Sequence, residues 1–124
     1  MRFRVAWFQI TGILIVLQFL LGGLVSSNII DPLYHIGLGF AVLAISLATM
    51  LAAIVSKPSL RSLKLGSGLL VILVFLQVPL GFALLDNSSP LLSGVHVANA
   101  IAILLTVFAS YFIARRWERE SFKV

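Results

Sequence analysis

LQFLLG at residues 17–22 returns as LQVPLG at residues 76–81, and each copy is followed by a short polar segment and then by a histidine. The two histidines, His35 and His96, are the only ones in the chain. Gln18 precedes His35 by 17 residues, and Gln77 precedes His96 by 19. The sequence therefore predicts an internal tandem repeat that carries one histidine at a matching position of each copy.

The composition is that of a membrane protein. Of the 124 residues, 60% are hydrophobic and only 10% are charged, and the mean hydropathy is +1.13. So short a chain has far more apolar surface than a soluble core of its size could hide. Four apolar segments, at about 5–25, 33–55, 65–85 and 91–114, are each long enough to cross about 30 Å of hydrocarbon as a helix.

The repeat groups these four segments into two helical hairpins. We expect an all-α integral membrane four-helix bundle that forms one transmembrane domain over residues 1–124. Its parts are a first repeat at about 5–55, a linker at 56–64, a second repeat at 65–114 and a tail at 115–124. Both hairpins enter and leave the membrane in the same direction, so the repeat is parallel and the two histidines face the same side.

The basic residues orient the predicted bundle. They lie before the first span, between the second and third, or after the fourth, and hence on one side of the membrane. The positive-inside rule predicts that this is the cytoplasmic side of the plasma membrane, with both termini there. The formal net charge of +5 thus reflects membrane orientation and does not indicate a nucleic-acid-binding surface. The nine basic residues are Arg2, Arg4, Lys57, Arg61, Lys64, Arg115, Arg116, Arg119 and Lys123.

The two histidines are candidate ligands of one shared cofactor. A buried ionisable ring is costly in a membrane, and two at matching positions indicate a common ligand. An Asp-Pro pair at 31–32 and a Ser-Pro pair at 89–90 are typical helix starts. They place His35 about one turn into its helix and His96 about one turn deeper, both near the outer face. Imidazoles from two facing helices could supply both axial ligands of a haem iron.

Other interpretations of the two histidines stay open. The chain has no cysteine, so thiolate metal sites and covalent attachment of haem through a Cys-x-x-Cys-His motif are excluded. Zinc or copper is less well suited than haem, because the only further candidate metal ligands near the histidines are the outer Asp31 and Asp86. A quinone or proton site, or histidines that hydrogen-bond across the bundle, would also account for them.

Small and polar residues near the histidines complete the candidate site. Gly39 and Ala100 each follow a histidine by one helical turn and would let a macrocycle approach the backbone, although such residues also serve plain helix packing. Gln18 and Gln77 are intramembrane amides that either hydrogen-bond a histidine ring or a cofactor, or clamp the first helix to the third. Asn99 could reach the ligand or satisfy a carbonyl freed by the proline of the third span.

This arrangement resembles one half of the heme A synthase family of cytochrome oxidase assembly proteins. The resemblance rests on Gln-x-x-x-Gly in the odd spans, a histidine at the outer start of the even spans, and the tandem hairpins. Family members of the usual length carry two four-helix halves, and each half holds a haem between histidines of its second and fourth helices. The resemblance therefore implies that His35 and His96 are haem ligands.

The chain also departs from the family pattern. The catalytic half has a glutamate three residues before its first histidine, where this chain has Pro32, with Asp31 one residue further away. The outer arginine of family members is missing, since residues 26–28 are Ser-Ser-Asn. In both respects the chain is more similar to the non-catalytic half, which holds haem b.

The expected function is that of a membrane cytochrome b. We expect one bis-histidine haem b near the outer face, acting in electron transfer as a small subunit or partner of a respiratory complex. One alternative is a heme A synthase that oxidises the methyl group of heme O, with Asp31 as the catalytic acid. Another is a cofactor-free assembly or structural subunit of an oxidase. Because full-length relatives contain two halves, the resemblance also implies a homodimer.

Overall fold

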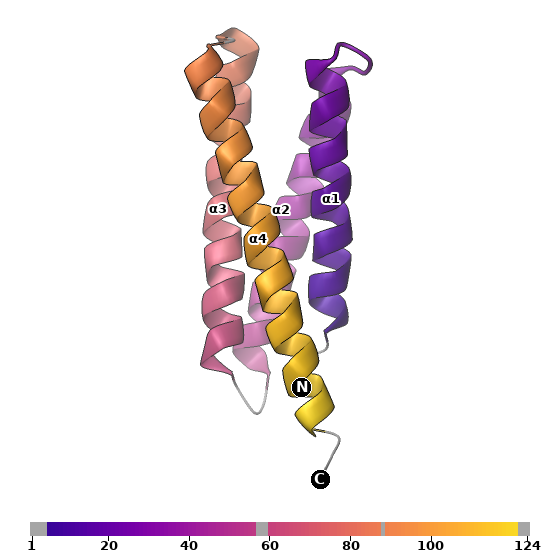
Figure 1. Cartoon of the computed structure of the whole chain (residues 1–124), viewed down its shortest axis with the longest axis vertical. Coiled ribbons are helices and arrows are strands. Elements are labelled where there is room, and N and C mark those ends of the chain that lie inside the picture. The colour runs from indigo at the N-terminus through magenta and orange to yellow at the C-terminus, as the bar shows by residue number, and fades with distance from the viewer. Residues whose placement is uncertain (1–4, 57–59, 88, 122–124) are drawn as a thin grey trace.

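Four long helices joined by short connections make up the fold (Figure 1). The computed structural model describes residues 5–56, 60–87 and 89–121. Each helix is long and apolar enough to cross a membrane, which confirms the predicted all-α four-helix membrane bundle. The helices are α1 Ala6–Ser26, α2 Pro32–Val55, α3 Arg61–Asp86 and α4 Pro90–Ser121.

Two helix starts follow the capping pattern seen in the sequence. The Asp31 carboxylate accepts a hydrogen bond of 2.8 Å from the Leu33 N–H, with proline in the first turn of α2. The Ser89 hydroxyl accepts one of 3.1 Å from the Leu92 N–H at the start of α4. Between α1 and α2 the backbone reverses at Asn28, which has a φ of 56°, a value that asparagine tolerates. These caps fix where the two histidine-bearing helices begin.

Both helices of the second hairpin extend beyond the predicted spans. α3 begins at Arg61, inside the predicted linker, because its first turn is held by Leu63, which is only 2% exposed. α4 continues through the predicted tail to Ser121, where an exposed Arg116–Glu120 pair one turn apart has a separation of 2.9 Å. These helix ends reach past the apolar spans, so membrane length alone does not set the helix boundaries.

The helices form a ring in which each one packs against two others. α1 contacts α2 and α4, and α3 contacts the same two helices. Within the part of the chain that the structure describes, no Cα atoms of the diagonal pairs α1–α3 and α2–α4 approach within 8 Å of each other. The two hairpins, α1–α2 and α3–α4, therefore lie side by side (Figure 1).

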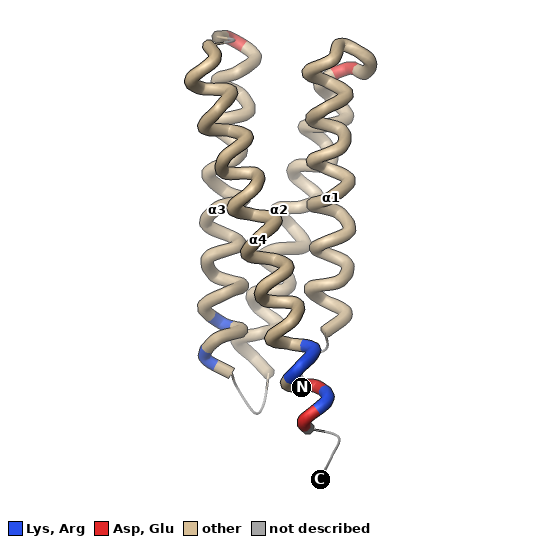
Figure 2. Tube along the Cα trace, viewed as in Figure 1, with Lys and Arg blue, Asp and Glu red and all other residues tan. Residues whose placement is uncertain are grey.

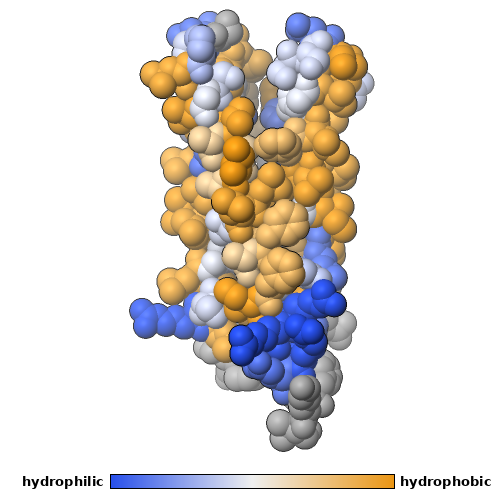
Figure 3. Space-filling model, viewed as in Figure 1, coloured by the Kyte–Doolittle hydropathy of each residue, from blue (hydrophilic) through white to orange (hydrophobic). Residues whose placement is uncertain are grey.

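Charge separates the two ends of the bundle. The described Lys and Arg residues gather at one end, which we call the basic end, while Asp31 and Asp86 lie at the opposite, distal end (Figure 2). Between the ends, apolar side chains dominate the surface (Figure 3), as expected of a lipid-facing protein. The basic residues at this end are Arg61, Lys64, Arg115, Arg116 and Arg119; Arg2, Arg4, Lys57 and Lys123 lie outside the described residues.

The buried core occupies the half of the bundle nearer the basic end. Small hydroxyl residues let the helices approach closely there. The Thr11 and Thr49 hydroxyls lie 2.9 Å apart, and Gly66 leaves space that the Ser110 hydroxyl fills. Among the described residues, no helix has a buried side chain on the distal side of a layer formed by Ile15, Val42, Val74 and Ile103.

Candidate two-histidine site

A cavity of about 390 Å³ opens between the two hairpins in the distal half of the bundle. Its size lies within the range of small-molecule and cofactor sites. The space-filling view shows the two hairpins parted by a cleft toward the distal end (Figure 3). The inner end of the cavity is its floor, made by the four buried residues Ile15, Val42, Val74 and Ile103.

The lining of the cavity repeats the internal symmetry of the sequence. Residues of α1 and α3 that line it correspond one to one, and the same holds for α2 and α4 with the exception of Phe40. The cavity is therefore built by both repeats in nearly the same way. The central pairs are Ile15 with Val74, Gln18 with Gln77, Gly22 with Gly81, His35 with His96, Gly39 with Ala100, and Val42 with Ile103.

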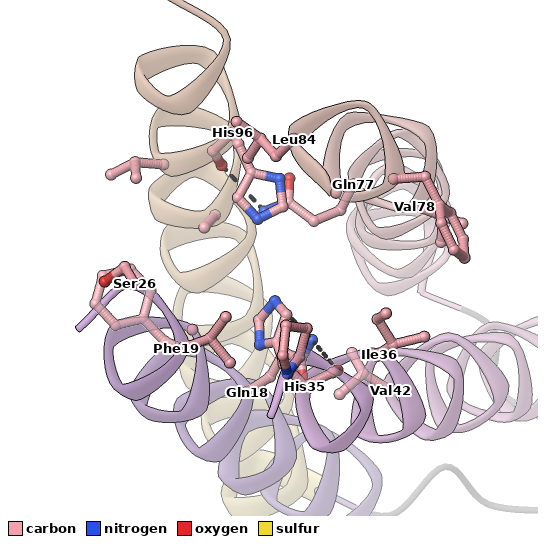
Figure 4. A pocket seen from close by; sticks show the side chains of 18 of the residues that line it. Gln18, Phe19, Ser26, His35, Ile36, Val42, Gln77, Val78, Leu84 and His96 are labelled. Atoms are coloured by element: carbon pink, nitrogen blue, oxygen red, sulfur yellow. Dashed lines mark hydrogen bonds between the residues drawn. The ribbon is translucent and has the colours of Figure 1, made fainter. Parts of the chain in front are cut away.

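The two histidine rings meet in this cavity. His35 enters from α2 and His96 from α4, on opposite sides of the space (Figure 4). Their ring centroids are 6.3 Å apart, and their planes are inclined by 61°. The difference in depth expected from the two helix starts does not keep the rings apart. The structure thus brings together the two histidines that the sequence singled out.

Each glutamine of the repeat hydrogen-bonds to the histidine residue of its own hairpin. The Gln18 side-chain N–H donates to the backbone carbonyl of His35 at 2.8 Å, and Gln77 donates to that of His96 at 3.0 Å. Gln18 Nε2 also lies 3.3 Å from Nε2 of the His35 ring. The expected bond to a histidine ring is therefore present for Gln18, whereas Gln77 bonds only the backbone of His96. The alternative clamp between the first and third helices is wrong, because the hydrogen bonds of both glutamines lie within their own hairpins and no Cα atoms of α1 and α3 approach within 8 Å.

Glycines bring the backbone close to these side chains. A Cβ atom at Gly22 would lie 3.0 Å from Cε1 of His35, and one at Gly81 would lie 3.5 Å from Cε1 of His96. Gly39 makes room for the Gln18 amide, since its Cβ would lie 3.0 Å from Gln18 Nε2. From the sequence, Gly39 was expected to let a ligand approach the helix backbone. Gly22 and Gly81 were noted there only as part of the repeated motif.

Asn99 supports the site from outside the cavity lining. Its side-chain N–H groups donate to Oε1 of Gln77 and, at 2.9 Å, to the backbone carbonyl of Leu73. It therefore does not turn into the cavity. The Leu73 carbonyl is also not the one that Pro79 frees, because a helical proline leaves the carbonyl four residues earlier, at Phe75, without its partner.

Asp31 lies away from the histidines. Its carboxylate is exposed at the start of α2 and caps that helix. It does not line the cavity, and within the described ranges no aspartate or glutamate does. The structure therefore does not bring the expected catalytic acid to the candidate site.

Three buried polar atoms of the site have no hydrogen-bond partner. They are Oε1 of Gln18 and Nδ1 of both His35 and His96, and they are the complete set of such side-chain atoms in the described chain. Buried polar atoms are normally satisfied, so a cluster of three at one cavity indicates a missing polar or coordinating group. In the described residues no group of three or more histidine, cysteine or acidic side chains could hold a bare metal ion.

The separation of the rings suits a metal placed between them. With metal–nitrogen bonds of about 2 Å, two imidazoles on opposite sides of one ion have centroids roughly 6 Å apart. The observed 6.3 Å agrees with this value. A cofactor that brings its own in-plane ligands would need only these two from the protein. The residues present therefore fit a haem better than a bare ion.

The fold and site define a multi-pass, four-helix membrane protein with one two-histidine cavity in the distal half of the bundle. Comparison of the chain with protein-family models, with curated proteins and with solved structures finds no match. Its function must therefore be inferred from the chemistry of this cavity.

Proposed function

We propose that the chain is a b-type haem protein of the membrane in which His35 and His96 would hold the haem iron. The observation that carries this proposal is the convergence of the two rings, whose centroids are 6.3 Å apart, in one cavity between the hairpins. Coordination to a shared iron would use one nitrogen of each ring. Haem supplies reversible one-electron chemistry when bound at such a site.

The walls of the cavity support a flat apolar ligand. Apart from the histidines and the two glutamines, most lining side chains are aliphatic or aromatic. Gly22 and Gly81 let the helix backbones approach the rings, and so hold each ring in place by packing. Ser93 lines the cavity near the start of α4 and offers a hydroxyl to a carboxylate of such a ligand, whereas the Ser26 hydroxyl donates to the Gly23 carbonyl at 2.8 Å.

Electron transfer is the activity that these residues support best. The chain's part is to hold two ligands in fixed positions and to exclude water from a low-dielectric pocket. Oxidation of a haem methyl group would call for further acid–base groups at the ligand. No carboxylate lines the described cavity, and Asp31 serves as a helix cap, which favours the cytochrome over the heme A synthase alternative.

The charge distribution supports an orientation for this cytochrome. We assign the basic end to the cytoplasm, in line with the positive-inside rule, and the membrane to the plasma membrane. The cavity then lies in the outer half of the bilayer. A haem so placed would exchange electrons with a respiratory complex on that side, as its small subunit or partner, or with a second copy of the chain.

A reduced-minus-oxidised optical spectrum of the purified protein tests this function. We expect a low-spin b-type signal with one haem per chain, and its loss or conversion to a high-spin signal in both His35→Ala and His96→Ala. Tyr34→Phe, in which the exposed neighbour of His35 is changed, is the matched control and should keep the signal. An intact, folded protein that binds no haem would refute the proposal and leave a structural subunit.

A further inference from the structure

We propose that Gln18 makes His35 the exchangeable one of the two ligands, so that the His35 side of the cavity accepts a small external ligand such as carbon monoxide. This inference rests on the proposed haem site. It follows from a difference between the two repeats: Gln18 contacts the ring of its histidine, whereas Gln77 contacts only the backbone of its own.

The repeats differ in how they hold their glutamines. In the second repeat, Asn99 donates a hydrogen bond to Oε1 of Gln77, while the Gln77 N–H donates to the His96 carbonyl. The position that corresponds to Asn99 in the first repeat is Leu38, which has no side-chain donor. Both ends of the Gln77 amide are thus engaged, and no hydrogen bond joins Gln77 to the His96 ring in the described structure.

Gln18 is held differently and reaches the ring of its histidine. Its Oε1 is buried without a partner, and its Nε2 donates one N–H to the His35 carbonyl. The second N–H faces Nε2 of the His35 ring at 3.3 Å. Because an amide NH₂ group can only donate, the ring nitrogen must accept through its lone pair, and the ring proton then resides on Nδ1.

The same lone pair cannot serve two partners. If Nε2 of His35 held the iron of a bound haem, Gln18 would lose its contact with the ring; if His35 were released, the Gln18 N–H would satisfy the freed nitrogen. His96 has no such substitute, because neither of its ring nitrogens has a hydrogen bond within the described residues. Loss of the His35 ligand is therefore compensated, and loss of the His96 ligand is not.

The exchange itself balances without any redox change. His35 departs with the lone pair of Nε2, which then accepts the Gln18 N–H, and its ring proton stays on Nδ1. The incoming ligand supplies the replacement electron pair. A hydrogen bond of this kind contributes a factor of about 2 to 13 to the exchange equilibrium. The chain thus favours an external ligand on the α2 side by that factor.

Carbon monoxide titration of the dithionite-reduced protein tests the inference. We expect Gln18→Leu to lower the affinity for carbon monoxide about 2- to 13-fold, because His35 loses the partner that stabilises its released form. Gln77→Leu is the matched control, since each variant removes one amide bond to a histidine carbonyl. Its shift should be smaller than that of Gln18→Leu, because Gln77 makes no hydrogen bond to the His96 ring in the described structure. Tyr34→Phe, which changes an exposed side chain, should keep the affinity within about twofold of the wild type.

A second variant keeps the test independent of the stability of Gln18→Leu. Leu38→Asn gives the first repeat the donor that Asn99 provides in the second, so it should draw Oε1 of Gln18 into a hydrogen bond and likewise weaken carbon monoxide binding. Equal carbon monoxide affinities in the wild type, Gln18→Leu and Leu38→Asn would overturn the inference. A shift in Gln77→Leu as large as that in Gln18→Leu would also overturn it. Neither result would contradict the proposed haem site. Failure of the wild type to bind any haem would instead overturn the proposed function.

Discussion

Gly22→Ala is the substitution that most sharply tests how the histidine rings are held. The added methyl group would lie 3.0 Å from Cε1 of His35 and 3.5 Å from Nδ1. At the equivalent position of the second repeat, the Cβ of Gly81→Ala would lie 3.5 Å from Cε1 of His96, an ordinary contact. The two substitutions are chemically identical, so the structure predicts that only the first displaces its ring.

The expected loss of haem affinity in Gly22→Ala follows from the contact distances. Carbon atoms pack best at about 3.5–4.0 Å, so the His35 ring must move by several tenths of an ångström to admit the methyl group. Overpacking of this kind costs about 1–3 kcal/mol, which corresponds to a loss in haem affinity of roughly 5- to 150-fold. Gly37→Ala, where a Cβ would meet nothing within 4 Å, should leave haem affinity unchanged.

Haem titration of the purified apoprotein, followed by absorbance, provides the assay. Gly22→Ala should bind haem more weakly than the wild type, whereas Gly81→Ala and Gly37→Ala should bind it with wild-type affinity. Circular dichroism of each apoprotein controls for loss of fold. Equal affinities for Gly22→Ala and Gly37→Ala would refute the view that the α1 backbone positions the His35 ring.

Three further predictions concern the scaffold around the site. Gly66→Ala should lower the free energy of unfolding by about 1–3 kcal/mol, because the added Cβ would clash with the Ser110 hydroxyl. The double variant with Ser110→Ala should regain the lost stability. Thermal unfolding that shows no such rescue would contradict this. Asn99→Leu should lower the free energy of unfolding by about 0.5–1.5 kcal/mol in the same assay, because the half-buried Gln77 side chain loses its donor at Oε1. A wild-type melting temperature would contradict this. Asp31→Ala should cost about 0.5–2 kcal/mol as a lost helix cap but leave the haem spectrum unchanged, and an altered haem product would instead restore Asp31 as a catalytic candidate.

Much of the fold was predictable from the sequence because membrane helices carry strong local signals. The apolar spans and the cap at Asp31 are set by composition and by neighbours along the chain, so they can be read without tertiary structure. The extension of α3 back to Arg61 was missed, because it depends on Leu63 packing into the core. Hydropathy reports where a helix crosses lipid and not where it ends.

The pairing of the two histidines in the candidate site was predictable from the sequence, but the contacts that support them were not. His35 and His96 stood out because intramembrane histidines are rare and these two recur with the repeat. The partners of Gln18 and Gln77 could not be deduced, because they depend on which helices are neighbours in the ring, and α1 turned out to face α2 and not α3. The use of Asn99 to lock Gln77 likewise depends on helix rotation, which small differences in apolar pattern do not fix.

Ligation of one haem by both histidines is tested most directly by pulsed electron paramagnetic resonance of the ferric protein labelled with ¹⁵N-histidine. We predict hyperfine couplings to two imidazole nitrogens in the wild type and to one in each of His35→Ala and His96→Ala. Two couplings in the wild type would establish that both rings bind the same iron. Coupling to fewer than two imidazoles in a wild-type protein that contains haem would contradict the two-histidine site.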